Sequence, residues 1–204
     1  MSALLLKDFY TLLRQTRLFL LIIVIFAVMP GSFMAGFAVI YAAMLPITAL
    51  AYDERSKWDS LAAMMPYTPT EIVISKYVLG YIGIGLAGLL ALAAQSIVSM
   101  VQYNTLESAD TASILLIACV ATVFLAITLP FMFKVGVEKG RILLFVILAA
   151  IAAAAMILGT KLDDYFNSVK LQMNTIALAA VTGSAVLNLC SIALAVRFYK
   201  RKSK

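Results

Sequence analysis

The sequence contains no histidine, and charged residues make up only 13% of its 204 residues. The lack of histidine removes the usual general base for activating a serine or cysteine nucleophile. The two cysteines and ten acidic residues form no cluster with the spacing of metal ligands, and no G-x-x-x-x-G-K-[ST] loop is present to bind nucleotide phosphates. We therefore expect no enzyme, no metal centre and no cofactor in this chain.

The long apolar stretches also contain no Asp, Glu, Lys or Arg. Ion-coupled carriers and voltage sensors need ionisable groups at membrane depth, and a passive channel needs a polar or charged ring in its spans. These three classes of membrane protein are therefore disfavoured.

Hydrophobic residues, by contrast, make up 64% of the chain, and the mean hydropathy is +1.02. Globular proteins carry about 45–50% apolar residues, so the composition indicates an integral membrane protein. We expect an all-α fold with a single domain over residues 1–204, in which six transmembrane helices follow an amphipathic interfacial helix. The expected segments are the interfacial helix 2–17, the spans 18–29, 33–51, 72–101, 113–133, 142–160 and 175–196, and a polar loop 53–71.

The distribution of basic residues predicts the orientation of these spans. On the expected topology, 14 of the 16 Lys and Arg residues lie on the side of the two termini, and only Lys161 and Lys170 lie on the other side. The positive-inside rule then places both termini in the cytosol. We expect a multi-pass protein of the bacterial plasma membrane. The net charge of +6 follows from this bias and does not indicate nucleic-acid binding.

Residues 2–17 form the amphipathic segment, with an apolar stripe of Leu5, Phe9, Leu12 and Leu13. We expect this helix to lie flat on the inner leaflet. The alternatives are that it begins the first span, or that it belongs to a signal peptide.

The polar stretch Asp53–Lys76, which includes the polar loop, interrupts the apolar sequence and contains seven of the 26 charged residues. Its first part is predicted to be a short amphipathic helix, because Trp58, Leu61, Ala62 and Met65 recur at helical spacing.

Capping signals predict where the helices of this loop begin and end. Ser56 with Asp59 would form a capping box at the start of the short helix, and Pro66 would end it. Thr68 is the predicted N-cap of the following span, with Glu71 at its third position.

Small residues line one face of the third span, where Gly80, Gly83, Ala87, Ala91 and Ala94 recur at intervals of three or four. Such a face permits close helix–helix approach. It would serve a subunit interface or a moving contact, or, as we favour, static packing within one chain.

Three polar residues within the spans, Gln95, Ser99 and Asn188, are candidates for lining a cargo path. Gln95 and Ser99 belong to a polar group near the outer end of the third span. They would face a wet vestibule or bond to neighbouring helices.

The stretch LPITALAYDERSKWDSLAAMMPYTPTEIVISKYVLG resembles the ABC-2 family of transporter permeases, and more narrowly the small permease subunits of the Pmt exporter of phenol-soluble modulins. The Met65-Pro66 pair departs mildly from the usual Leu-Pro. The matching residues are Ala51, Asp53, Glu54, Trp58, Asp59, Glu71, Val73, Ser75, Lys76 and Tyr77.

The resemblance implies the permease subunit of an ATP-driven exporter. Two permeases, identical or closely related, would pair in the lipid bilayer, each docking a separate ATP-binding-cassette ATPase that holds ATP and magnesium. Amphipathic or antimicrobial peptides would be the cargo. The residues expected to couple to the ATPase are Asp53, Glu54, Arg55, Trp58, Asp59, Leu61, Met65 and Glu71, with a second cytosolic contact at Lys134, Glu138 and Lys139.

The alternative is a membrane protein that transports nothing. It would be an assembly, sensor or immunity component that uses the loop only to hold a partner.

Overall fold

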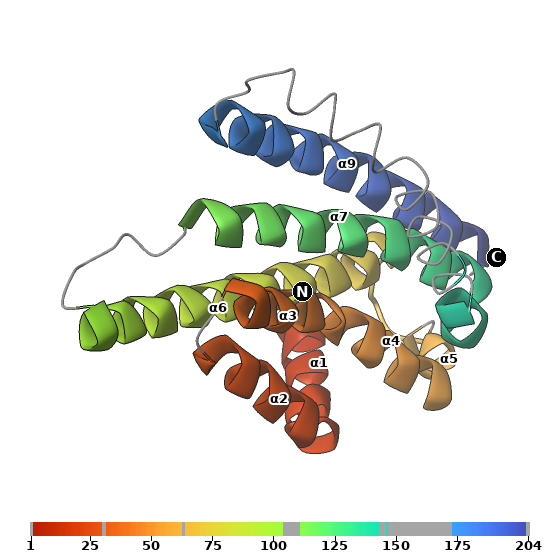
Figure 1. Cartoon of the computed structure of the whole chain (residues 1–204). Helices are drawn as coiled ribbons and strands as arrows, with labels where there is room; N and C mark the ends of the chain where they lie inside the picture. Colours follow the sequence, from red (N-terminus) through yellow and green to blue (C-terminus); the bar gives the residue numbers. More distant parts are fainter. Residues whose placement is uncertain are drawn as a thin grey trace.

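The computed structural model of the chain describes residues 2–29, 32–62, 64–103, 111–142, 146 and 173–202 (Figure 1). Within these ranges every regular element is a helix, and residues 137–142 form a further short helical segment. The named helices are α1 (Ser2–Gln15), α2 (Arg17–Val28), α3 (Ser32–Ala43), α4 (Leu45–Arg55), α5 (Trp58–Ala62), α6 (Pro69–Tyr103), α7 (Thr111–Val135) and α9 (Met173–Lys202).

Four of the described segments are long and apolar enough to cross a membrane: Met34–Arg55, Pro69–Ile97, Ile114–Val135 and Ala180–Arg201. A fifth candidate is the pair α1 and α2, which meet at a bend of 85°. The all-helical, membrane-spanning character agrees with the sequence, whereas the number six stays a prediction. The span expected at 142–160 lies, apart from residues 142 and 146, outside the described residues.

The span expected at 33–51 consists of two helices, α3 and α4, separated at Met44. Pro46 lies in the first turn of α4, where its missing N–H leaves no helical hydrogen bond unmade. The break at Met44 therefore lets Pro46 start a helix instead of interrupting one. The second helix, α4, continues to Arg55, four residues beyond the predicted end of the span.

The long helices α6, α7 and α9 run alongside one another, and α3 packs on α6 and α7 (Figure 1). The small-residue face of α6 lies inside this arrangement. A Cβ atom at Gly80 would lie 2.1 Å from Leu125 of α7, and one at Gly83 would lie 2.9 Å from Leu45 of α4. Ala87 and Ala91 are fully buried. This face is therefore covered by helices of the same chain, and a contact between two permeases would have to use another surface.

The N-terminal helix α1 packs against α4 and α6, and its predicted apolar stripe is divided between two surroundings. Leu12 is buried in the protein core, whereas Phe9 and Leu13 are exposed. The helix therefore packs one side against the rest of the chain and leaves apolar side chains exposed on another.

Candidate functional site

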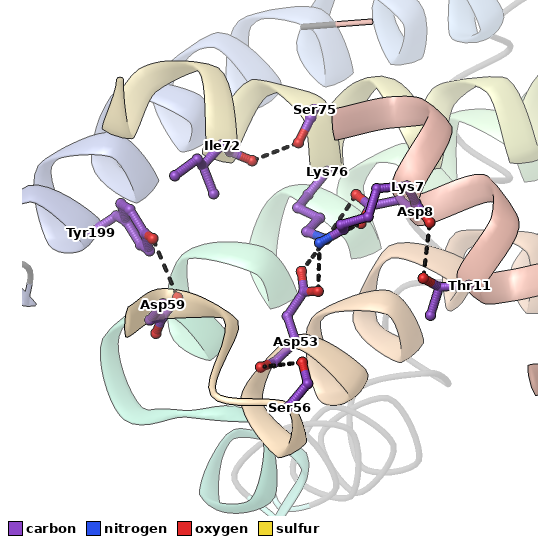
Figure 2. Close-up of polar contacts among 10 residues, drawn as sticks. All are labelled: Lys7, Asp8, Thr11, Asp53, Ser56, Asp59, Ile72, Ser75, Lys76 and Tyr199. Atoms are coloured by element: carbon purple, nitrogen blue, oxygen red, sulfur yellow. Dashed lines mark hydrogen bonds and ion pairs between the residues drawn. The ribbon is translucent and has the colours of Figure 1, made fainter. Parts of the chain in front are cut away.

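Four charged side chains from three helices meet beside the polar loop (Figure 2). Lys7 and Asp8 lie on α1, Asp53 on α4 and Lys76 on α6. The ammonium nitrogen of Lys76 lies 2.8 and 2.7 Å from the two carboxylate oxygens of Asp8 and 2.5 Å from Oδ2 of Asp53. That of Lys7 lies 2.6 Å from Oδ1 of Asp53 and 3.1 Å from Oδ1 of Asp8. We call these four residues the ion-pair cluster.

Three of the four members of the ion-pair cluster are buried, and Lys7 is partly exposed. Asp8 and Lys76 are each 1% exposed, and Asp53 is 8% exposed. A buried charge is tolerated only when it is paired and hydrogen-bonded. Here each carboxylate contacts both ammonium groups, so the charges compensate fully within the group. The cluster therefore joins α1, the end of α4 and the start of α6 into one unit.

Hydroxyl groups around the cluster form hydrogen bonds within their own helices and leave the carboxylates to the lysines. Ser75 donates to the carbonyl of Ile72, and Thr11 donates to the carbonyl of Lys7 (Figure 2).

Trp58 extends the cluster to α5. The ammonium nitrogen of Lys7 lies 4.0 Å from the centre of the Trp58 ring, a cation–π distance. The ring is partly buried against the protein core. Trp58 thus binds α5 to α1 and does not project freely from the loop.

The other two acidic residues at this end of the loop also contact the chain itself. Oε2 of Glu54 accepts a hydrogen bond from the main-chain N–H of Val137 at 2.7 Å. Oδ1 of Asp59 accepts one from the hydroxyl of Tyr199, on α9, at 3.2 Å (Figure 2). Together with Asp53, these carboxylates connect the loop to three separate parts of the molecule. From the sequence, all three carboxylates were expected to contact the ATPase.

A model of the family of ABC-2 transporter proteins matches residues 3–200, nearly the whole chain. The chain belongs to the ABC-2 transporter family. It is accordingly a permease subunit of an ABC transporter, a membrane transport component that is not itself a catalyst. The family implies an ATPase partner and a lipid bilayer. No curated protein and no solved structure matched the chain.

The N-cap predicted at Thr68 of this ABC-2 permease is present, whereas the capping box predicted at Ser56 is not. The Thr68 N–H donates to the Glu71 carboxylate at 2.9 Å, and the Glu71 N–H donates to the Thr68 hydroxyl at 3.3 Å, so α6 begins as predicted. The box predicted for Ser56 and Asp59 is wrong. Ser56 lies at the C-cap of α4 and donates to the carbonyl of Asp53. Lys57 then turns the chain with a φ of 54°.

The solvent-facing part of the ABC-2 permease loop contains apolar side chains beside basic and acidic ones. Met64 is 84% exposed, and Leu61 and Met65 are also exposed, as are Arg55 and Lys57. Sequence reasoning named Leu61, Met65 and Arg55 but missed Met64. Of the predicted apolar face, Trp58 and Ala62 turn toward the protein. They lie four residues apart at the two ends of α5 and therefore share one side of that helix.

The second predicted cytosolic contact lies next to this loop. Lys134, Glu138 and Lys139 are exposed, and the ammonium group of Lys134 lies 5.2 Å from the ring centre of Phe198 on α9. The hydrogen bond between Glu54 and Val137 brings this turn beside the end of α4. The role of these residues in contacting an ATPase stays a prediction.

The three candidate cargo-lining residues have different surroundings. Asn188 is buried, donates to the carbonyl of Ser184 at 2.8 Å and accepts from the hydroxyl of Tyr81 at 2.8 Å. Its amide is thus engaged in joining α9 to α6. The Nε2 atom of Gln95 is buried without a hydrogen-bond partner among the described residues. The side chain of Ser99 lies outside the described residues.

Sequence reasoning missed Lys7 and Lys76 as partners of Asp53, and Asp8 as the second carboxylate of the cluster. Two signals were available. Asp8 is the first acidic residue of the chain, and the next is Asp53. Lys76 lies at the start of a long apolar helix, where an unpaired charge would be costly. Each of these isolated charges needed a distant partner of opposite sign.

Proposed function

We propose that this permease is the membrane subunit of an exporter and that the first part of its polar loop, residues 53–65, receives movement from the ATPase. The observation that supports this function is the set of contacts made by Asp53, Glu54 and Asp59. They bind the loop to the ion-pair cluster, to residues 137–142 and to α9. A displacement of α5 would therefore reach α1, α6 and α9 together.

The exposed side chains of the loop define the chemistry of the docking contact. Leu61, Met64 and Met65 are exposed together with Arg55 and Lys57. Glu54 and Asp59 are exposed as well, but their carboxylates are hydrogen-bonded to Val137 and Tyr199. A complementary partner surface is an apolar groove with an acidic rim. Trp58, which contacts Lys7, would position α5 within the permease and would not itself enter the groove.

Export of amphipathic or antimicrobial peptides by a permease dimer completes the proposal. The spans offer apolar surface and uncharged polar groups, which suit a cargo with both apolar and polar faces. The resemblance to the phenol-soluble modulin exporters favours the same cargo class. A dimer contact is available on the side of α6 away from the core, where Ile82, Leu86 and Leu89 are exposed.

The docking role is tested by photo-crosslinking in native membranes. A photoreactive phenylalanine analogue replaces Met64 in one variant and Leu86, which is exposed in the middle of a span, in a control. We expect the Met64 variant alone to capture a protein whose sequence contains a G-x-x-x-x-G-K-[ST] nucleotide loop. Capture of lipid alone at both positions would contradict docking.

The transport role is tested with the captured ATPase and the permease reconstituted in nanodiscs. We expect an amphipathic peptide to increase ATP hydrolysis, and the triple variant Leu61→Ala, Met64→Ala, Met65→Ala to abolish the increase. Binding of the ATPase without any response to peptide would favour the alternative, a complex that holds a partner but transports nothing.

A further inference from the structure

A polar cleft lies between the inner end of α4 and residues 137–142, on the side of the loop away from the ion-pair cluster. Its volume is about 420 Å³. The lining residues are Thr48, Ala51, Tyr52, Glu54 and Arg55 from α4, and Val137, Glu138 and Arg141 from the facing segment. The α4 residues recur at intervals that place them along one side of the helix.

The two walls of this cleft are held in place by specific contacts. Glu54 binds the main-chain N–H of Val137 across its base. Gly136 has a φ of +91°, and a Cβ atom there would lie 2.8 Å from a carboxylate oxygen of Glu54. At the other end of the segment, a Cβ atom at Gly140 would lie 2.7 Å from the sulfur of Met132. These contacts therefore fix the position of the two walls and the shape of the cleft.

Two arginines face the cleft from its opposite walls. Arg55 and Arg141 are exposed, and neither has an ion-pair or hydrogen-bond partner among the residues that the structure describes. The guanidinium group matches phosphate oxygens in geometry and charge. With one guanidinium group on each wall, the cleft suits the anionic phosphate group of a ligand.

Acidic groups in the same cleft limit which phosphate compound fits. The carboxylate of Glu138 lines it beside the arginines, while that of Glu54 is already bonded to Val137. With two basic and two acidic residues, the lining carries no net charge. It therefore suits a ligand with both a phosphate and a positive group better than a purely anionic one.

The position of the cleft indicates where such a ligand comes from. The candidate span Met34–Arg55 ends at one of the two arginines. Thr48 and Ala51 lie one to two turns further into the span, and Tyr52 has the amphipathic side chain favoured at a membrane interface. The cleft thus lies at the level of lipid headgroups, with an apolar approach from the hydrocarbon side.

We propose that this cleft binds the headgroup of a phospholipid with a primary ammonium group, a phosphoethanolamine lipid. Arg55 and Arg141 bind its phosphate, and Glu138 accepts a hydrogen bond from its ammonium group. The acyl chains extend past Ala51 into the bilayer. Lipid binding needs only the permease, so it can be measured without the ATPase, although Arg55 belongs to both this site and the proposed docking surface.

The test is native mass spectrometry of the full-length permease alone, delipidated in detergent and titrated with single lipids. Phosphatidylethanolamine is compared with phosphatidylcholine, which cannot donate from its quaternary ammonium group, and with anionic phosphatidylglycerol. We expect phosphatidylethanolamine to bind best, and Arg55→Gln or Arg141→Gln to weaken its binding about tenfold. Glu138→Gln should remove the preference over phosphatidylcholine while leaving binding itself intact.

Lys139→Gln is the matched control, since Lys139 is exposed on the same turn but does not line the cleft. Its lipid binding should equal that of the unchanged protein. Equal binding by all variants would overturn the site, and stronger binding of phosphatidylglycerol would overturn the choice of headgroup. Free phosphoethanolamine is added as a competitor. If it bound as tightly as the lipid, the ligand would be a soluble phosphate compound, and the lipid assignment would be wrong.

Discussion

Two sets of polar contacts join α6 to its neighbours, and they differ in charge. At the end of α6 next to the polar loop, the ion-pair cluster connects Lys76 to α1 and α4 through full charges. Further along α6, the hydroxyls of Tyr77 and Tyr81 contact Ser191 and Asn188 of α9. We call this second set the neutral seam. It contains only hydroxyl, amide and main-chain groups.

The comparison shows that the stability lost with a contact depends on whether the contact is charged or neutral. In the ion-pair cluster, removing one member leaves an uncompensated buried charge, which costs about 3–5 kcal/mol. In the neutral seam, the loss of one interhelical hydrogen bond costs about 0.6 kcal/mol on average and about 1.7 at most. The same helix is thus fixed strongly at the loop and weakly within the membrane. Such a gradient suits a helix that is moved from the end next to the loop.

The largest effect is expected for Lys76→Met. Asp8 and Asp53 would keep only Lys7 between them, and Asp8 is almost fully buried. We expect a loss of about 3–5 kcal/mol, seen as a fall of roughly 10 °C in the midpoint of thermal unfolding in detergent. The inserted protein should also decrease in amount.

A double variant, Asp8→Leu with Lys76→Met, serves as the control for this prediction. It leaves Lys7 and Asp53 as a neutral pair at 2.6 Å, so most of the lost stability should return. A double variant less stable than Lys76→Met alone would show that the cluster is not held by charge compensation.

The helical fold was predictable because hydrophobic composition and the absence of charge from long stretches dictate spanning helices. The start of α6 was predictable for a local reason, since Thr68 and Glu71 are three residues apart and satisfy each other. Such features depend on neighbours in the sequence.

The direction of the loop's acidic residues was not predictable in the same way. Asp53 binds a lysine 46 residues before it and another 23 residues after it, and Asp59 binds Tyr199, 140 residues away. The spacing of residues within the loop does not indicate these partners, because they lie far away in the sequence. A rule that every isolated charge near a span needs a counter-charge would have pointed to Asp8 and Lys76, although not to the geometry of the cluster.

A smaller effect is expected for Lys7→Met. The Lys7 side chain is 25% exposed, so water can partly replace its contacts with the two carboxylates. We expect a loss of about 1–2 kcal/mol, measured by the same thermal unfolding. Intrinsic fluorescence of Trp58, the only tryptophan of the chain, should change with it because the cation–π contact at 4.0 Å is lost. A destabilisation equal to that of Lys76→Met would mean that exposure does not matter in this cluster.

Tyr81→Phe tests the costlier of the two contacts in the neutral seam. It removes the donor to Oδ1 of Asn188 and leaves that buried oxygen without its partner, while the amide nitrogen keeps the carbonyl of Ser184. We expect a loss of about 1 kcal/mol, or about 2–4 °C in the unfolding midpoint. Asn188→Leu in the Tyr81→Phe background removes the unpaired group as well, and should cost less than the sum of the two single changes. Strict additivity would show that the two side chains do not interact.

The smallest effect is expected for Tyr77→Phe. The Tyr77 hydroxyl lies 2.5 Å from that of Ser191, and Ser191 donates its own proton to the main-chain carbonyl of Ala126, so Tyr77 must be the donor. Replacement of Tyr77 by Phe leaves Ser191 with its hydrogen bond to Ala126. The Tyr77 hydroxyl itself is removed, so it cannot remain as an unpaired group. No buried group is then left wholly unsatisfied, and the expected loss is about 0.6 kcal/mol or less. Ser191→Ala should cost more, because it deprives both the Tyr77 hydroxyl and the Ala126 carbonyl of a partner. If Tyr77→Phe proved the more harmful of the two, Ser191 would not be the bridge between α6 and α7, and this part of the neutral seam would have to be held by the packing of Tyr77.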